Sequence, residues 1–240
     1  MKFYHSKLLN SFSNVTHAFT LRDNGNLAFH VGDNESHVKA NHEQLAKELN
    51  YKKSSLVHMK QIHSDIVHLV IDDEFENPPT CDALITNKIE TPLMVMVADC
   101  SPILFYDDKN RVIAAAHAGR AGAFKNIVKK VVDSFINEFN SETQNIYVSI
   151  GASIGVCCYE VGSKIKAQTK ELKMEYAIEK KETGFYLDIR KILKTQLIEC
   201  GIKEENIEIS DECTRCKNNK YFSYRANSNT GRFSGVIMLR

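Results

Sequence analysis

The 240-residue sequence has no tryptophan, only 4 prolines and no long hydrophobic run. Apolar runs such as residues 93–98 are far shorter than the roughly twenty residues that a membrane-spanning helix needs. The N-terminus also lacks the uninterrupted apolar segment of a signal peptide. We therefore expect a cytoplasmic protein with no membrane partner.

An excess of charge of either sign is missing as well. Lys and Arg total 31 and Asp and Glu total 30, which leaves a net charge of +1. A dedicated nucleic-acid binder usually has a basic excess, so we expect no nucleic-acid partner. The final thirty residues are locally basic, and this local bias fits a small anionic ligand better than a long polyanion.

The cysteines do not form a regular disulfide pattern. There are 7 of them, an odd number, and Cys157 and Cys158 are adjacent. Such a set is typical of the reduced thiols of a cytosolic protein.

Composition and chain organisation favour one folded domain. The sequence is 43% hydrophobic and 25% charged, which is ordinary for a soluble protein and argues against disorder or a coiled coil. It shows no repeat, linker or low-complexity tract. Pro78-Pro79 and the acidic stretch 72–76 predict a surface loop, so residues 1–240 are expected to form a single domain.

Predicted helices and strands alternate along the chain. The clearest helix is 121–139, whose apolar residues recur at helical spacing, and Asp188 and Gly201 are suited to begin and end another helix. Interleaved helices and apolar strands predict an α/β or α+β domain with a mixed sheet. Helices are expected over 38–49, 121–139 and 188–200, and strands over 66–71, 93–98, 103–106, 112–116, 146–150 and 233–239.

Reactive side chains gather where predicted strands should end. If residues 60–65 are extended, Gln61, His63 and Asp65 share one face, because side chains alternate along a strand. Taken alone, His63 is more easily explained as a surface or core histidine than as a ligand.

Two further strand ends carry polar residues. The predicted strand 93–98 is followed by an acid, Asp99, and a thiol, Cys100. Pro102 is expected to prevent simple continuation of the strand's hydrogen-bond ladder. The next strand ends at His117, and Arg120 follows at the start of the predicted helix, where backbone N–H groups favour an anion. A buried structural cysteine and an exposed arginine are the simpler alternatives.

His63, Cys100 and His117 together form a stronger pattern. Two imidazoles and a thiolate suit zinc, and three protein ligands leave a fourth position open, as in a catalytic zinc site. The same residues also suit a cysteine hydrolase with Cys100 as nucleophile and His117 as base. The spacing of these three residues in the sequence does not decide between a zinc site and a cysteine hydrolase.

Two C-terminal motifs are less specific. Cys213 and Cys216 form a lone Cys-x-x-Cys pair that lacks two further ligands, and Cys157-Cys158 has the wrong spacing to supply them. We therefore expect two thiols in a loop. Residues 221–225 mix aromatic rings with cations and could stack a base and hold a phosphate, although an ordinary strand and turn explains them too.

Six motifs in one order resemble the bacterial polyphenol oxidase laccase-domain family. Its members are described as zinc-dependent purine nucleoside phosphorylases with adenosine deaminase activity. The likeness extends from about His17 to the C-terminus. The motifs are Gln61-Ile62-His63, Cys81-Asp82-Ala83-Leu84, Ala98-Asp99-Cys100-x-Pro102, Ala116-His117-Ala118-Gly119, Cys158-Tyr159-Glu160-Val161-Gly162, and Tyr221-Phe222-Ser223-Tyr224-Arg225 with Thr230-Gly231-Arg232.

The resemblance implies a single α+β domain, a mixed β-sandwich flanked by α-helices. It also implies that His63, Cys100 and His117 bind zinc. The sequence departs from the family at two arginines. Arg120 stands one position earlier than in the family's His-Ala-Gly-Trp-Arg-Gly, and the segment that begins at Arg22 has one glycine fewer than Arg-x-Gly-Gly.

The resemblance further implies phosphorolysis of adenosine, inosine or methylthioadenosine to the free base and ribose 1-phosphate or its methylthio analogue. Adenosine deamination is the expected side activity. We expect phosphate near Arg22, Arg120 or Arg225, substrate contact at Gln61, and proton steering by Asp99. The partners are then purine nucleosides and phosphate, and the expected state is a monomer or weak homo-oligomer.

Three rival functions remain from the residues. A multicopper oxidase binds its copper through repeated His-x-His pairs, and the 9 histidines here form none. Copper is therefore expected only as an adventitious occupant of a His₂Cys site. A cysteine hydrolase stays open, and a non-enzymatic binding module is disfavoured by the reactive residues at strand ends.

Overall fold

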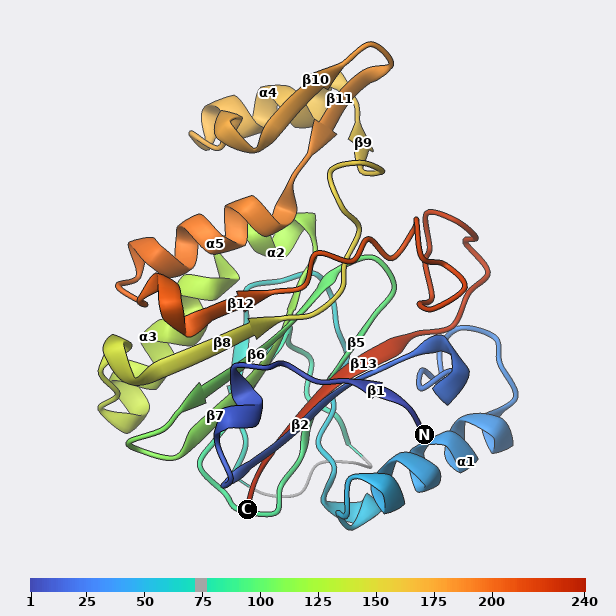
Figure 1. Ribbon diagram of the computed structural model, residues 1–240, viewed down its shortest axis with the longest axis vertical. Coiled ribbons are helices and arrows are strands. Elements are labelled where there is room, and N and C mark those ends of the chain that lie inside the picture. The colour runs from blue at the N-terminus through green and yellow to red at the C-terminus, as the bar shows by residue number, and fades with distance from the viewer. Residues whose placement is uncertain (72–76) are drawn as a thin grey trace.

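The computed structural model describes residues 1–71 and 77–240 and shows a single α+β domain of stacked layers (Figure 1). A four-stranded sheet packs on a six-stranded sheet, and helices cover both outer faces. The acidic stretch 72–76, predicted as part of a surface loop, lies outside the described residues. No helix in the described ranges is long and apolar enough to cross a membrane.

The six-stranded sheet is mixed. Its central strands pair antiparallel, while the strand at each edge runs parallel to its neighbour. In spatial order the strands are β12 (Ile207–Ile209), β8 (Ile146–Ile150), β6 (Ser101–Asp107), β7 (Val112–Ala118), β4 (Ala83–Thr86) and β3 (Val67–Leu69).

The four-stranded sheet is antiparallel throughout. Its strands are β1 (Phe3–Tyr4), β2 (Val15–Thr20), β13 (Phe233–Leu239) and β5 (Leu93–Val97). β13 lies between β2 and β5, so a late segment of the chain holds two early ones together.

Strands at the centre of the stack are apolar on both faces because each face is buried. In β6, Ile103 and Phe105 pack toward the helices, whereas Leu104 and Tyr106 pack toward the other sheet. This two-residue period explains why such strands appear in the sequence as continuous apolar runs.

Two helices begin directly after a capping side chain, and the first of them starts at residue 35, three residues before the predicted start at 38. The side chain of Asn34 accepts a hydrogen bond from Ser36 N at the start of α1 (Glu35–Glu48). The side chain of Asp188 accepts one from Lys191 N at the start of α5 (Ile189–Glu199), and Gly201 follows that helix with φ of 88°. α1 covers the four-stranded sheet, while α5 lies with the helices that cover the six-stranded sheet.

The predicted continuous helix 121–139 is wrong in one respect. The structure divides it into α2 (Arg120–Phe124) and α3 (Ile127–Phe139). Asn126 between them has φ of 60°, a left-handed conformation that asparagine tolerates. Its side chain accepts a hydrogen bond from Lys129 N at 3.1 Å, so it ends one helix and caps the next.

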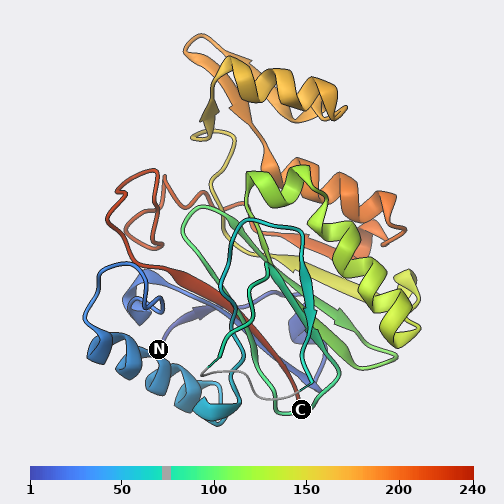
Figure 2. The same cartoon turned by 180° about the vertical axis from the view of Figure 1, so that it is seen from behind.

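The structure also contains a small lobe whose helix and strands were not predicted from the sequence. It holds α4 (Ser163–Glu171) and a sheet of three short strands, and it stands apart from the main layers (Figures 1 and 2). Its strands are only two to four residues long, and β10 (Ile178–Lys181) is mostly charged, so they lack the apolar runs that mark a buried sheet. In spatial order they are β10, β11 (Gly184–Leu187) and β9 (Glu160–Val161).

Pro102 does not stop a ladder as predicted. It is the second residue of β6, where it lies opposite His117 of β7, and its carbonyl accepts a hydrogen bond from Gly151 N. Position near the start of a strand is where proline is tolerated. The chain instead changes sheets between β5 and β6, and Asp99 and Cys100 form that crossing.

Candidate active site and metal centre

His63, Cys100 and His117 converge from three separate elements. They come from the loop before β3, the connection between β5 and β6, and the end of β7. One ligand atom from each lies within 4.8 Å of the others, and Cys100 Sγ is 4.0 Å from His63 Nε2. An ion bound tetrahedrally by sulfur and nitrogen would separate such atoms by ~3.6 Å, so the donors fit a metal with little adjustment.

The segment that carries His63 is a loop and not the extended strand considered above. His63 has φ of 58°, which breaks the side-chain alternation expected of a strand. The carboxylate of Asp82 accepts hydrogen bonds from His63 N at 3.0 Å and Ser64 N at 2.6 Å, which hold this unusual turn in place. Gln61 anchors the same loop, because its side-chain amide pairs with both backbone groups of Met96.

Asp82 also orients the second histidine. Its Oδ1 lies 2.8 Å from His117 Nδ1, and its backbone carbonyl accepts His117 N at 2.7 Å. A carboxylate on one ring nitrogen fixes the tautomer and leaves the other nitrogen to face the site, as in many metal centres. No role was predicted for Asp82 from the sequence, although an acid directly before the apolar β4 was the available signal.

The site is strongly polarised. Burial would raise the pKa of Cys100, but the neighbouring imidazoles of His117 and His63 outweigh it and lower that pKa to about 6. Burial would lower the pKa of His117, but Cys100 and Asp82 raise it to about 9. Burial likewise opposes ionisation of Asp82, yet bonds from His117 and Ser64 keep its pKa well below the usual range. The thiolate that a metal needs is therefore favoured here.

Gly119 allows the ligands to approach one another. A Cβ atom at this position would lie 2.8 Å from Cys100 Sγ and 3.2 Å from His63 Cδ2. Any side chain would displace at least one ligand. The glycine in the predicted turn after β7 is thus explained by close packing.

Asp99, next to Cys100, has φ of 86° and uses both carboxylate oxygens. Oδ1 accepts a hydrogen bond from Thr214 Oγ1 at 2.6 Å, and Oδ2 accepts one from Arg225 N at 2.6 Å. It therefore joins the Cys100 turn to the C-terminal loop that carries Arg225.

A cavity of about 1100 Å³ lies over the three converging residues. Gln61, Asp99, Arg120 and Arg225 line it as well. Arg22 instead lines a separate hollow beside Asn218, to whose carbonyl it donates. Tyr224 of the aromatic segment 221–225 lines the cavity together with Arg232, as do Phe29 and Tyr159, for which no site role was predicted.

Arg120 and Arg225 both lie near the side chain of Tyr159. The Arg225 guanidinium lies 5.2 Å from the centroid of the Tyr159 ring, and the positive charge of Arg120 acts on the same tyrosine. Burial raises the pKa of Tyr159. The arrangement places two forked cations beside the converging histidines and cysteine, where an oxyanion would be stabilised.

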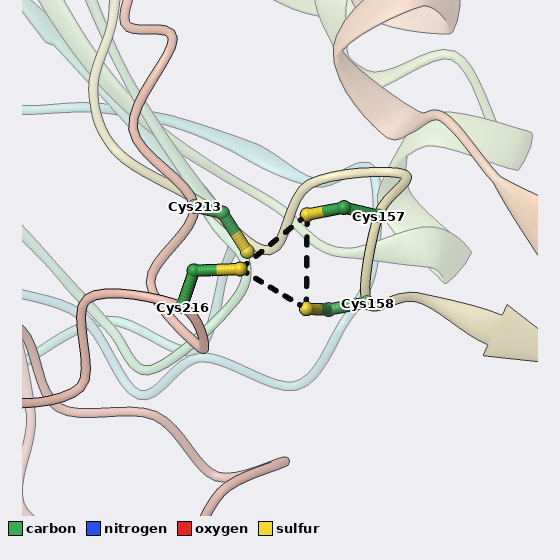
Figure 3. A group of neighbouring side chains, drawn as sticks. All are labelled: Cys157, Cys158, Cys213 and Cys216. Carbon is green, nitrogen blue, oxygen red and sulfur yellow. Dashed lines mark hydrogen bonds between the residues drawn. The ribbon is translucent and has the colours of Figure 1, made fainter.

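Cys213 and Cys216 are free thiols in a loop as expected, but the prediction that no further ligands accompany them is wrong. The structure brings them together with Cys157 and Cys158, whose sulfur atoms all lie within 4.8 Å of one another (Figure 3). Cys157 and Cys158 were excluded because adjacent cysteines do not have the Cys-x-x-Cys spacing. They lie in a tight turn at residues 156–158, which lets both sulfur atoms reach the other pair.

Residues 15–240 match the family described as multi-copper polyphenol oxidoreductase laccase. The chain belongs to this family. A purine nucleoside phosphorylase of Corynebacterium glutamicum is 36% identical over 218 residues, covering 89% of this chain and 86% of the relative. Purine nucleoside phosphorylase YfiH of Escherichia coli is 31% identical over 219 residues, covering 90% and 87%.

Solved structures of laccase-family relatives show the same fold. Bacillus licheniformis hypothetical protein YfiH superposes with a TM-score of 0.90 at 29% identity, covering 97% of this chain and 94% of the other. Geobacillus stearothermophilus YlmD gives 0.89 at 27%, covering 95% and 93%. The family resemblance and the α+β fold expected from the sequence are thus confirmed, and the names of the relatives support an enzyme.

Proposed function

We propose that this chain is a purine nucleoside phosphorylase that cleaves adenosine, inosine or methylthioadenosine with phosphate. The observation that carries the proposal is that one cavity is lined by His63, Cys100 and His117 and by two arginines beside them. The names of the relatives point to the same reaction. The products are the free base and ribose 1-phosphate, or its methylthio analogue.

We assign zinc to the triad because its donors are two imidazoles and one thiolate. A zinc ion held by these three residues would supply a Lewis acid to the cavity. Asp82 fixes His117, and Gly119 leaves the room that the donors need. Copper would enter the same site only as an adventitious occupant, because its general affinity for such ligands is high.

The protein residues bind and orient the two substrates. Arg120 holds phosphate by forked hydrogen bonds, and Arg225, whose guanidinium also donates to the carbonyls of Cys158 and Glu160, adds positive charge beside it. An oxygen of that phosphate attacks ribose C1′ as the bond to the purine breaks and the purine leaves with the electron pair. Exposed Tyr224 and Phe29 offer rings against which a base can stack. Gln61 shapes the wall by anchoring its loop to Met96.

The role of Asp99 is better explained as positioning. Both of its oxygens already accept hydrogen bonds, from Thr214 and Arg225. Its carboxylate therefore holds the Arg225 loop against the Cys100 turn. The earlier hypothesis that Asp99 steers a proton to or from the base is supported by its place in the cavity wall alone.

Adenosine deamination is proposed as a side activity of the same cavity. Water would replace the amino group at C6 of adenine and release ammonia, which needs no phosphate. The protein is proposed to act in the cytoplasm as a monomer or weak homo-oligomer.

The deciding experiment incubates adenosine with the purified protein, with and without phosphate, and separates the products by chromatography. We expect adenine and ribose 1-phosphate only with phosphate, and slow formation of inosine without it. Adenine release that is indifferent to phosphate would indicate hydrolysis. Full activity after chelation, together with a free and alkylatable Cys100, would support the cysteine hydrolase instead.

A further inference from the structure

A second group of potential ligands lies outside the cavity described above. Cys157 and Cys158 follow β8, and Cys213 and Cys216 lie in the loop after β12. Figure 3 shows the four sulfur atoms pointing toward a common centre from these two loops. All four are free thiols, and the proposed phosphorolysis does not use them.

The sulfur positions have the dimensions of a tetrahedral metal site. The Sγ atoms of Cys157, Cys158 and Cys216 form a nearly equilateral triangle with sides of 3.6, 3.6 and 3.4 Å. Four sulfurs bound to zinc at 2.3 Å would lie ~3.8 Å apart. Cys213 supplies the fourth corner, within 4.8 Å of the others.

Disulfide bonds explain this triangle less well. A disulfide would bring two of the three sulfurs to 2.05 Å and leave the third without an equivalent partner. The structure instead shows no preferred pair among them, since the three separations differ by only 0.2 Å (3.6 minus 3.4). Equal spacing is what a shared central ion produces.

The local fold explains how adjacent cysteines can both face one point. Side chains of consecutive residues diverge in a strand, but residues 156–158 form a turn in which Cys158 N donates to Gly155 O. A Cβ at Gly155 would lie 2.7 Å from Arg190 Nη2, 3.2 Å from Cys157 Sγ and 3.3 Å from Cys213 Cβ, so a side chain there would crowd the cysteines. The turn is thus packed directly against the Cys-x-x-Cys loop.

The surroundings also suit thiolates. Gly155 N donates to Cys213 Sγ at 3.2 Å, and the Arg215 guanidinium lies 3.6 Å from Cys158 Sγ. N–H donors and a cation reduce the cost of gathering negative sulfur atoms around one ion.

We propose that Cys157, Cys158, Cys213 and Cys216 bind a structural zinc ion, separate from the ion assigned to His63, Cys100 and His117. Four protein ligands close the coordination sphere, so this ion would have no position for substrate. Its role is to fasten the two loops together. Thr214, within the Cys-x-x-Cys loop, donates to Asp99, and Arg225 donates to the carbonyl of Cys158. The zinc would thereby steady the wall of the cavity.

The test counts zinc per chain in the full-length protein, purified under reducing conditions without chelator, by elemental analysis. We expect two zinc ions in the wild type and one in Cys216→Ser and in Cys157→Ser, both of which replace exposed residues. Cys200→Ser is the matched control, because Cys200 lies at the end of α5 and outside the cluster. It should keep two. His63→Ala should lose the other ion, so failure of either site is visible separately.

The absorption spectrum of the cobalt-substituted wild-type protein gives a second test that does not depend on a variant folding correctly. Cobalt substituted for zinc should show strong thiolate-to-cobalt charge-transfer absorption, and Cys216→Ser should lose most of it while His63→Ala keeps it. Zinc content that Cys216→Ser leaves unchanged, or an intact mass that reveals disulfides among the four cysteines, would overturn the proposal. None of these outcomes depends on the substrate of the cavity.

Discussion

Asp82 and His117 are joined twice, once through side chains and once through the backbone. The carboxylate lies 2.8 Å from Nδ1 of the imidazole, and the Asp82 carbonyl accepts the His117 N–H at 2.7 Å. Both residues are buried. Because the same carboxylate also holds the His63 turn, one acid positions two of the three proposed metal ligands.

Asp82→Asn should weaken zinc binding and activity by about 10–100-fold, the range typical for loss of a carboxylate behind a metal-bound histidine. The amide is similar in size but cannot accept all the N–H groups that now meet the carboxylate. Competition with a calibrated chelator measures the affinity. Asp65→Asn, in the same loop but without a cavity-lining side chain, should behave as wild type. Equal affinities in the two variants would contradict the assigned role.

Gly119→Ala should abolish activity and lower zinc content at the three-ligand site, because the new methyl group would lie 2.8 Å from Cys100 Sγ. Gly162→Ala is the matched control, since nothing lies within 4 Å of a Cβ at that position. Metal analysis and the adenosine assay report on both variants. A fully active Gly119→Ala protein would show that the ligands can separate without consequence.

Arg120→Ala should raise the half-saturating phosphate concentration about tenfold or more, as expected for loss of a charge-assisted bond worth ~1.5–3 kcal/mol. Zinc content and deamination should change little, because neither needs phosphate. Lys125→Ala, at the end of α2 and outside the cavity lining, is the control. If Arg22→Ala rather than Arg120→Ala changes the phosphate dependence, phosphate binds in the other hollow.

Stability should fall in mild acid because His17 is buried in β2. Burial, with a smaller contribution from His5, lowers the pKa of His17 to about 4, whereas the unfolded value is near 6.5. Between these values the unfolded chain binds a proton that the folded protein excludes. As the pH falls from 7 to 5, His17 should therefore lower the free energy of unfolding by up to about 2 kcal/mol.

Urea unfolding at several pH values tests this expectation against His17→Gln, which keeps an acceptor for Ser6 N–H but does not titrate. The wild type should lose more stability than the variant below pH 6.5, and the two should run parallel above it. Parallel curves across the whole range would show that folding does not shift the pKa of His17.

Strong local patterns predicted much of this architecture. β8 and β13 begin and end at the residues expected, because continuous apolar runs reflect strands buried on both faces. The convergence of His63, Cys100 and His117 was predicted as a zinc hypothesis from ligand chemistry, and the structure brings the three together. Cys100 and His117 drew attention because they lie at the ends of apolar runs, whereas His63 was included because an imidazole completes the ligand set.

Features that depend on tertiary contacts were not predictable in the same way. The four-cysteine cluster joins loops more than fifty residues apart, and the conformation of the 157–158 turn is not apparent from spacing. Asp82 acts through contacts with a loop and with a strand, neither of which is adjacent to it in sequence. The break at Asn126 was hidden because apolar residues continue at helical spacing on both sides of it.

The central place of β13 has a consequence for biosynthesis. β2 and β5 each pair with β13, so neither acquires that partner until the ribosome has added residues 233–239. The turn that carries Cys100 follows β5 directly and crosses between sheets. A nascent chain that already contains His63, Cys100 and His117 would thus still lack the framework that sets their geometry. Pairing over such sequence separation is intrinsically slow, so maturation of the site should trail translation.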